Sequence, residues 1–299
     1  MPRKLFIPSR VSVLPLLMAM ALAAALPAKA QNLFVSTWPT SITEFTPSGT
    51  QSIFASGLYL PNGLAFNNVG DLFVADEGSG HIYEITPGGT QSTFASGLSA
   101  PYGLAFNRAG DLFVTDNGSD SITEITPGGT QSIFAFGLSN PSGLAFNRVG
   151  DLFEADYISG HIYEFTPGGA KSTFASALSG PSGLAFNSAG DLFQTGGNGN
   201  IYKFTPGGAQ STFASGLIGS YALAFNSQGD LFQSDFGNGN ITEFTPGGVK
   251  STFASGLNYP LGLAFQGEML PVPEPSVLGL LTVSATTYLI RRLRICHCQ

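Results

Sequence analysis

Reactive side chains are scarce in this sequence of 299 residues, which contains two cysteines, three histidines and one tryptophan. Both cysteines, Cys296 and Cys298, lie within the last four residues, so no disulfide can cross-link the body of the chain. Two thiols around His297 at the extreme end are weak evidence for a metal site. No Ser-His-Asp set and no histidine pair at metal-ligand spacing is present, which weighs against the common hydrolase and zinc chemistries.

Charged residues are also few, at 10% of the chain, and the formal net charge is −7. The region of residues 31–266 holds only five of the twelve basic residues, so this region is more acidic than the chain as a whole. These five are Arg108, Arg148, Lys171, Lys203 and Lys250. We expect no nucleic-acid partner, because binding to phosphates depends on basic side chains.

Repetition is what the sequence has in abundance. The word Gly-Leu-Ala-Phe begins at five glycines and, as Ala-Leu-Ala-Phe, at one alanine, with a spacing of forty residues and once of thirty-nine. These six starts are Gly63, Gly103, Gly143, Gly183, Ala222 and Gly262. A period of this length indicates a solenoid, a propeller or another array of repeated units.

Each repeated unit contains four short apolar words, which we predict to be strands. In the unit of residues 101–135 the words are residues 103–106, 112–116, 122–125 and 132–135. Turn residues separate them: Gly110 can take the positive φ of a hairpin loop, and Thr126-Pro127-Gly128-Gly129 suits a type II turn with positive φ at its third residue. Both faces of the first two strands are apolar, so we expect them to be covered on both sides.

Radial stacking in a β-propeller would let such units cover one another, whereas a parallel β-helix needs shorter coils and a sandwich would not repeat its sequence. Every word occurs six times. The repeats begin at a second word, residues 33–35, and end at a first word, residues 262–265. The sequence therefore predicts an all-β, six-bladed β-propeller over residues 31–266, with four-stranded antiparallel blades. One C-terminal strand joins three N-terminal strands and leaves no open edge at the joint.

The words also carry a family resemblance. Residues 61–76, Pro-x-Gly-Leu-Ala-Phe-Asn-x-x-Gly-Asp-Leu-Phe-Val-Ala-Asp, resemble the NHL repeat, and the resemblance covers most of the chain. It implies a six-bladed propeller. It does not specify an activity, because the family includes binding modules and related propellers include lactonases and lyases.

Residues 1–30 lie outside the repeat and are typical of a secretion signal. A basic start is followed by an apolar run, residues 11–26, and by the small-x-small sequence Ala-Lys-Ala at residues 28–30. A short membrane anchor is the alternative, but the apolar run is short and contains Pro15. We therefore expect cleavage before Gln31 and secretion across the inner membrane.

The repeat is followed by a linker, residues 267–275, and by a hydrophobic segment with a basic tail, residues 276–299. This arrangement resembles the PEP-CTERM sorting signal of Gram-negative bacteria. The residues that carry the resemblance are Pro273, Glu274, Pro275, Arg291 and Arg292. The resemblance implies transient membrane association, processing by an exosortase-type enzyme, and release to the cell surface or extracellular matrix. The alternative is an ordinary C-terminal transmembrane helix, although the apolar run is slightly short for a permanent span.

Propellers usually bind ligands at the end of the central channel where the loop into each first strand meets the loop between the second and third strands. These loops differ more between the repeats than the strands do, and they contain tyrosines and asparagines. Such side chains can stack on and hydrogen-bond to sugars or peptides. Drift among duplicated repeats is the alternative explanation. The candidate ligand-binding residues are Tyr59, Asn62, Tyr102, Asn140, Tyr221, Asn258 and Tyr259.

An aspartate ends the second strand in four of the six units: Asp76, Asp116, Asp156 and Asp235. A partial ring of carboxylates could hold Ca²⁺. The sequence favours a structural role instead, since a short Asp side chain accepts hydrogen bonds from backbone N–H groups of the following turn. We expect no obligatory cofactor.

The sequence favours a binding or structural module over an enzyme. Related lactonases hold a divalent ion with a Glu, Asn and Asp set that breaks the repeat symmetry, whereas here most glutamates recur in the third strand. Glu77 and Glu154 are exceptions without evident partners, and no catalytic residue can be assigned. We expect a secreted, surface-sorted propeller that binds protein or polysaccharide in the envelope or extracellular matrix. The alternative is a metal-dependent lactonase-like hydrolase that uses the central channel.

Overall fold

The computed structural model describes residues 31–267. The predicted secretion signal (residues 1–30), the Pro-Glu-Pro motif and the hydrophobic C-terminal segment with its arginines lie outside the described residues. Within residues 31–267 the helical structure is a single 3-10 turn, η1 (Asn117–Ser119), and no helix is long and apolar enough to span a membrane.

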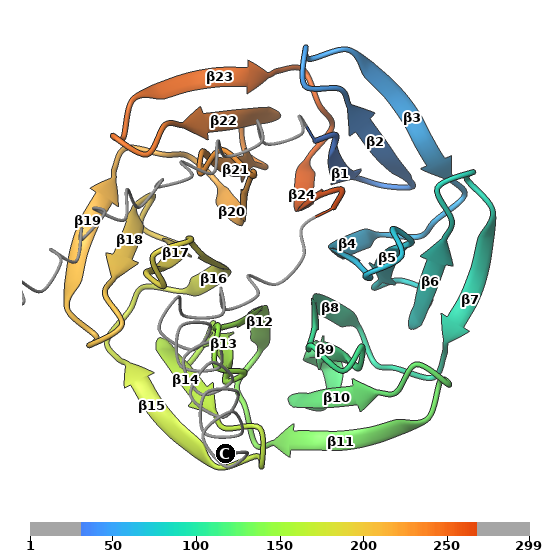
Figure 1. The fold of residues 1–299 in the computed structure, drawn as a ribbon, viewed down its shortest axis with the longest axis horizontal. Coiled ribbons are helices and arrows are strands. Elements are labelled where there is room, and N and C mark those ends of the chain that lie inside the picture. Colours follow the sequence, from blue (N-terminus) through green and yellow to red (C-terminus); the bar gives the residue numbers. More distant parts are fainter. Residues whose placement is uncertain (1–30, 268–299) are drawn as a thin grey trace, which may run out of the picture.

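Six four-stranded antiparallel sheets, the blades, surround a central axis and confirm the predicted propeller (Figure 1). Blade 1 contains β24 (Pro260–Phe265), β1 (Leu33–Thr37), β2 (Ser41–Phe45) and β3 (Gln51–Ser56), and blade 2 contains β4 (Pro61–Phe66), β5 (Leu72–Asp76), β6 (His81–Ile85) and β7 (Gln91–Ala95). Blade 3 contains β8 (Pro101–Phe106), β9 (Leu112–Asp116), β10 (Ser121–Ile125) and β11 (Gln131–Phe136), and blade 4 contains β12 (Pro141–Phe146), β13 (Leu152–Asp156), β14 (His161–Phe165) and β15 (Lys171–Ala175). Blade 5 contains β16 (Pro181–Phe186), β17 (Leu192–Gly196), β18 (Ile201–Phe204) and β19 (Gln210–Ala214), and blade 6 contains β20 (Ser220–Phe225), β21 (Leu231–Asp235), β22 (Asn240–Phe244) and β23 (Lys250–Ala254).

Blade 1 closes the propeller in the predicted way, because its innermost strand β24 comes from the C-terminal end of the repeats. Strand β24 pairs antiparallel with β1, with Phe265 opposite Leu33 and Leu263 opposite Val35. The Gln266 N–H continues this pairing by donating to the Asn32 carbonyl at 3.0 Å. The two ends of the repeat region are thereby held together in one sheet, with no open edge at the joint.

The second strand of each blade buries both faces because every blade lies between two others. In blade 3, Leu112 packs against blade 2, whereas Phe113 packs against blade 4. The Phe113 ring makes edge-to-face contacts with Phe134 of its own blade and Phe146 of the next blade, at centroid distances of 4.9 and 5.1 Å. Equivalent three-ring contacts are centred on Phe34, Phe73, Phe153, Phe193 and Phe232. This repeated contact stabilises every interface between blades.

Hydroxyl groups near the axis form a second link between blades. The Thr115 hydroxyl accepts from the Gly103 N–H at 2.6 Å and donates to the carbonyl of Ser142 in the next blade at 2.8 Å. Ser36, Thr195 and Ser234 make the same bridge in their blades. Because a buried N–H that loses its partner costs about 1–3 kcal/mol, each bridge contributes to the closed architecture. Blades 2 and 4 have Ala75 and Ala155 at this position.

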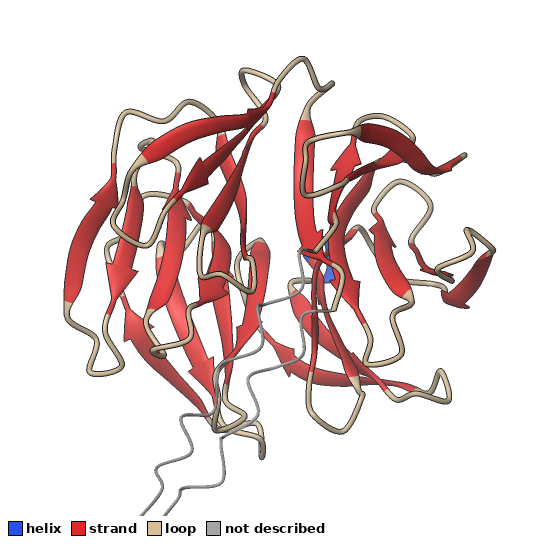
Figure 2. Cartoon of the chain, turned by 45° about the horizontal axis from the view of Figure 1, so that its top comes forward, coloured by secondary structure: helices blue, strands red, loops and turns tan. Residues whose placement is uncertain are grey.

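The turns at one end of the strands, which we call the turn end, are nearly identical copies in sequence. Figure 2 shows the loops and turns that join the strands at both ends, in tan. In the Asn-x-x-Gly-Asp turn of blade 3, Asn107 Oδ1 accepts from the Asp111 N–H at 2.9 Å, and Asn107 Nδ2 donates to the Asp111 carboxylate at 2.9 Å. Gly110 has φ 90°, which agrees with its predicted left-handed conformation. Local side-chain bonds of this kind explain why Asn, Gly and Asp recur in this turn.

The predicted type II turn at Thr-Pro-Gly-Gly is wrong in one respect. The positive φ lies at the fourth residue, Gly129 (φ 81°), and not at Gly128. The Gly129 N–H donates to the Thr126 carbonyl at 2.8 Å. A left-handed residue placed after the turn suits the right-handed twist of the two strands that the turn connects.

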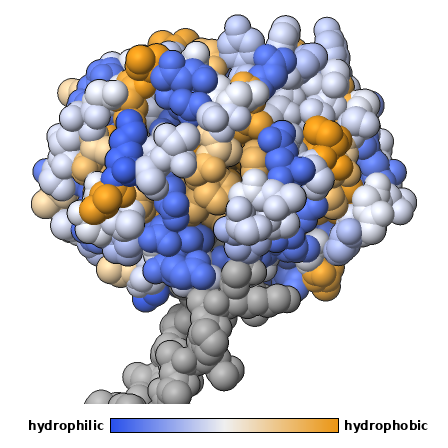
Figure 3. Space-filling view, turned by 90° about the horizontal axis from the view of Figure 1, so that it is seen from above, coloured by the Kyte–Doolittle hydropathy of each residue, from blue (hydrophilic) through white to orange (hydrophobic). Residues whose placement is uncertain are grey.

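The outer side of the propeller carries apolar residues singly among polar ones. Figure 3 shows one such side, on which hydrophobic and hydrophilic residues alternate over the surface. The most exposed is Phe136 of β11, at 82% exposure, where the other five blades have serine. Scattered apolar side chains of this kind are normal on a soluble surface.

Candidate functional site

At the other end of the strands, which we call the cavity end, two loops of each blade meet. They are the loop into the innermost strand and the turn after the second strand. Main-chain bonds join them: the Tyr157 N–H donates to the Asn140 carbonyl at 3.2 Å, and the Phe236 N–H donates to the Gly219 carbonyl at 3.0 Å. The accepting residue is left-handed in every blade, at Leu60, Ala100, Asn140, Gly180, Gly219 and Tyr259. Because main-chain groups make the contact, the side chains at both positions can differ from blade to blade.

The aspartates that end the second strands hold the incoming loop against the blade. Asp76 Oδ1 accepts from the Tyr59 N–H at 2.8 Å, and the Asp116 carboxylate accepts from the Ser99 N–H at 2.9 Å. Burial raises the pKa of both carboxyls, while these hydrogen bonds act in the opposite direction. Each aspartate bonds to the loop that enters its own blade. Within residues 31–267, no three His, Cys, Asp or Glu residues are grouped to hold a metal ion.

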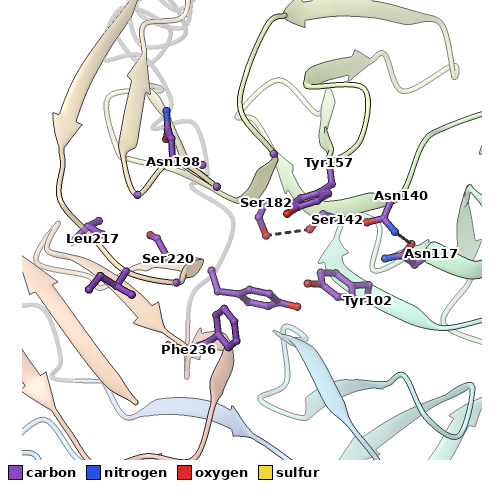
Figure 4. A pocket seen from close by; sticks show the side chains of 17 residues that line it. Tyr102, Asn117, Asn140, Ser142, Tyr157, Ser182, Asn198, Leu217, Ser220 and Phe236 are labelled. Carbon is purple, nitrogen blue, oxygen red and sulfur yellow. Dashed lines mark hydrogen bonds between the residues drawn. The ribbon is translucent and has the colours of Figure 1, made fainter. Parts of the chain in front are cut away.

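A cavity of about 690 Å³ lies at this end, among the loops of blades 3 to 6 (Figure 4). The wall contains phenols, amides, hydroxyls and apolar groups, and no residue of the described chain that borders it is Asp, Glu, His, Lys or Arg. Asn140 Nδ2 donates to Asn117 Oδ1 at 2.5 Å, and the Ser142 and Ser182 hydroxyls lie 3.2 Å apart. The wall is therefore uncharged and rich in hydrogen-bonding groups.

Three of the candidate ligand-binding residues, Tyr102, Asn140 and Tyr221, lie in the cavity wall. Asn62 is buried outside the wall, and its Oδ1 accepts from the Tyr221 hydroxyl at 3.1 Å. Tyr59, Asn258 and Tyr259 lie on the same end of the propeller but outside the wall. The structure thus brings together part of the predicted set and adds residues that were not predicted.

The added residues include Asn117, Tyr157 and Phe236, each of which directly follows the second strand of its blade. A signal for them exists in the sequence, because this position holds a different residue in every repeat. The six residues are Trp38, Glu77, Asn117, Tyr157, Gly197 and Phe236. Comparing the repeats position by position, rather than searching the loops for Tyr and Asn, would have found them.

Two phenols in the cavity wall contact each other, since the ring centroids of Tyr102 and Tyr221 lie 5.7 Å apart. Burial raises the pKa of the Tyr102 phenol above its ordinary value, and the nearby carboxylate of Glu77 adds to this shift. Tyr102 therefore stays neutral, and its hydroxyl can both donate and accept a hydrogen bond.

Blade 5 explains why the cavity lies to one side of the symmetric propeller. Gly196 replaces the aspartate of four other blades, Gly197 follows it, and the turn is one residue shorter, which accounts for the spacing of thirty-nine. The neighbouring blades 4 and 6 place Tyr157 and Phe236 at the position of Gly197. The absence of a side chain at this position of blade 5 leaves the space that the neighbours border.

The two glutamates without evident partners in the sequence have different surroundings in the structure. Glu77 does have a partner, because its Oε2 accepts from Asn62 Nδ2 at 2.9 Å. Glu154 lies in β13 at 0% exposure, and among the described residues neither of its carboxyl oxygens has a hydrogen-bond partner. Neither glutamate belongs to the cavity wall.

Burial raises the pKa of the Glu154 carboxyl well above its ordinary value of 4.5, and the Asp156 carboxylate adds to the shift. Lys171 and the backbone N–H of Ser142 oppose it with smaller effects. The next two blades place Gln194 and Gln233 at the same position, and each donates its amide to the carbonyl of the following residue. A protonated Glu154 also has a hydrogen to donate, so the neutral form suits this site.

A second cavity of about 550 Å³ lies around the axis at the turn end. The Leu-Ala-Phe words of all six blades line it, together with Gln31 and Gly267 at the two ends of the described chain. Its wall repeats from blade to blade, in contrast to the wall of the first cavity.

Solved structures resemble this fold at low sequence identity. A chain of a nidogen–laminin complex aligns with a TM-score of 0.71 and 20% identity, over 80% of this chain and 100% of that chain. A virginiamycin B lyase from Staphylococcus aureus aligns with a TM-score of 0.61 and 18% identity, over 80% and 90% of the two chains. A gluconolactonase from Xanthomonas campestris aligns with a TM-score of 0.64 and 17% identity, over 79% and 89%. No protein-family model and no curated protein matches the sequence. The chain is thus a six-bladed propeller of an architecture that serves both binding proteins and enzymes.

Proposed function

We propose that this protein is a binding module that holds an uncharged, polar part of its ligand in the cavity of blades 3 to 6. The observation that carries the proposal is the cavity wall, in which the described residues supply two phenols in contact, amides and hydroxyls but no charged side chain. Burying an unpaired charge next to such a wall would be costly, whereas a neutral group rich in donors and acceptors can be satisfied.

The chemistry of the wall favours binding over hydrolysis. General acid–base catalysis needs a titratable group within reach of the substrate. The described wall offers tyrosine, asparagine and serine, and the pKa of Tyr102 is shifted away from the range in which it would exchange a proton. The same residues supply oriented hydrogen bonds and aromatic faces, which are sufficient for recognition.

The resemblances to the NHL repeat and to the PEP-CTERM signal support a proposal for where this module acts. In this proposal the N-terminal segment directs secretion, and an exosortase-type enzyme processes the C-terminal segment. The propeller then acts in the envelope or extracellular matrix of a Gram-negative bacterium, with a protein or polysaccharide as its ligand.

The proposal is tested by filling the cavity with a side chain that the propeller already accepts elsewhere. Gly197→Tyr copies Tyr157 of blade 4, and a Cβ at Gly197 would meet no heavy atom closer than 3.4 Å, so the fold should accept it. We expect ligand captured from envelope and matrix extracts by the purified protein to be lost in this variant, while thermal unfolding stays unchanged.

The matched control for Gly197→Tyr is Gly207→Ser at the turn end. It copies Ser48 of blade 1, and a Cβ at Gly207 has its nearest neighbour, the Thr205 hydroxyl, 4.0 Å away. Capture should match the unmodified protein. Equal capture by all three proteins, measured by mass spectrometry and sugar analysis of the eluates, would rule out the cavity as the binding site.

A further inference from the structure

We propose that the ligand is a neutral glycan chain that begins in the cavity and continues over a row of aromatic side chains toward blade 1. The inference rests on the proposed function and adds the class of the ligand and its path. The aromatic row consists of Tyr102, Tyr221, Phe236, Tyr259 and Trp38.

The row is continuous although its members come from blades 3, 6 and 1. Beyond the 5.7 Å contact of Tyr102 with Tyr221, ring centroids lie 6.2 Å apart from Tyr221 to Phe236 and 6.0 Å from Phe236 to Tyr259. The last step, from Tyr259 to Trp38, is 5.7 Å. Tyr102, Tyr221 and Phe236 border the cavity, whereas Tyr259 and Trp38 lie beyond it. The row therefore leads out of the cavity and across the cavity end.

The outer members present their rings to solvent instead of packing them into the core. Trp38 is 44% exposed, Tyr259 is 48% exposed and Phe236 is 41% exposed. Each ring keeps enough open surface to receive a ligand, while its contacts with the neighbouring rings limit its freedom. Rings that are already ordered lose little conformational entropy when a ligand stacks on them.

One main-chain bond and one side-chain bond fix the outer end of the row. The Trp38 N–H donates to the Asn258 carbonyl at 3.1 Å, and Asn258 Nδ2 donates back to the Trp38 carbonyl at 2.7 Å. Tyr259 has φ 43°, a left-handed conformation that is unusual for a bulky residue and that costs free energy. Blades 5 and 6 have glycine at this position, so the fold itself does not require tyrosine there.

The combination of groups points to sugar rather than to peptide or nucleic acid. A sugar ring has an apolar C–H face, which suits aromatic stacking, and hydroxyls at its edge, which suit the amides and hydroxyls of the cavity wall. Among residues 31–267, the wall has no basic side chain for phosphate or sulfate groups and no acidic side chain for amino sugars. A chain of neutral sugars can use the cavity and the aromatic row at the same time.

Trp38 makes the test direct, because it is the single tryptophan of the chain and lies at the far end of the row. Purified full-length protein is titrated with neutral monosaccharides, disaccharides and longer oligomers of the same sugars, while tryptophan emission and calorimetric affinity are recorded. We expect longer oligomers to bind more tightly and to change the emission of Trp38, whereas monosaccharides fill the cavity without reaching it.

Two variants remove the outer rings, and one variant serves as control. Tyr259→Gly relieves the left-handed backbone, and Trp38→Ala leaves the main-chain bonds of Trp38 in place. Each should weaken binding of long oligomers about tenfold, which corresponds to 1.4 kcal/mol, and leave monosaccharide affinity unchanged. Phe136→Ser removes an exposed aromatic residue from β11 and copies the serine of the other blades, so it should change neither affinity.

The outcomes separate this inference from the proposed function. Equal affinity for monosaccharides and oligomers, with both outer variants unchanged, would overturn the chain path but preserve binding in the cavity. Capture that Gly197→Tyr does not affect would remove the proposed function, and the inference with it. A proline-rich peptide that binds and changes Trp38 emission, while every neutral glycan fails to bind, would overturn the glycan assignment.

Discussion

The two ends of the propeller differ in how much their residues vary from blade to blade. At the turn end the repeats are nearly copies, with Asn, Gly and Asp in the same places in five blades and Thr-Pro in all six. At the cavity end the residue after the second strand is different in every blade, and the residue before the innermost strand varies almost as much. Both ends are exposed loops, so exposure alone does not account for the contrast.

The hydrogen bonds explain the contrast. The turn end depends on side chains, as in the paired bonds between Asn107 and Asp111. At the cavity end, aspartates such as Asp76 also hold the loops, but the two variable positions are joined through main-chain groups, as in the bond from the Tyr157 N–H to the Asn140 carbonyl. The propeller can therefore change the side chains at these two positions without losing the bond between them, and this freedom allowed an uncharged cavity and an aromatic row to form.

The strongest test of the contrast compares two phenylalanines. Phe113→Ala in the second strand of blade 3 removes a buried ring that contacts Phe134 and Phe146. This variant should lower the free energy of unfolding by about 3–5 kcal/mol. Phe236→Ala at the cavity end removes a ring that is 41% exposed, and should change it by no more than about 0.5 kcal/mol. Urea unfolding measures both. A comparable loss in the two variants would contradict the separation between fold and cavity end.

A second test concerns Glu154, a buried polar residue in the second strand of blade 4, where the neighbouring residues are apolar. The raised pKa means that the folded state keeps a proton that the unfolded state releases above about pH 4.5. Stability should therefore fall as pH rises from about 4.5 toward the folded pKa, and level off above it. Glu154→Gln copies Gln194 and Gln233, and should be more stable than the unmodified protein at pH 7 and equally stable below pH 4.5. Parallel pH profiles of the two proteins in chemical unfolding would show that Glu154 is ionised in the fold.

The smallest expected effect is a difference in stability between two asparagine variants, one at each end of the propeller. Asn107→Ala at the turn end removes both bonds to Asp111 and should cost about 1 kcal/mol. Asn117→Ala at the cavity end removes the bond from Asn140 Nδ2, and should change stability by less than about 0.5 kcal/mol while weakening ligand binding. Unfolding curves and affinities are measured on the same preparations. A larger loss of stability in Asn117→Ala than in Asn107→Ala would contradict the proposed difference between the two ends.

Much of the candidate site could not be read from composition alone. Tyr102 and Tyr221 were predictable because phenols stand out in the segments that lead into the innermost strands, although the structure places both residues at the start of these strands, β8 and β20. Their 5.7 Å contact was not, because it joins residues of blades 3 and 6 that lie across the axis from one another. Phe236 and Trp38 occupy the position that differs in every repeat, but the sequence does not show that their rings join Tyr259 in one row.

The sequence by itself determined the propeller, because its information is local and repeated. Apolar words separated by turn residues specify strands, six copies specify six blades, and the offset between the first and last words specifies how β24 closes blade 1. The tertiary structure decided where the symmetry is broken. A missing side chain at Gly197 becomes a cavity only when Tyr157 and Phe236 stand on either side of it. Glu154 has a raised pKa only because two blades enclose it. Both effects arise from contacts between repeats, and a pattern within one repeat does not contain them.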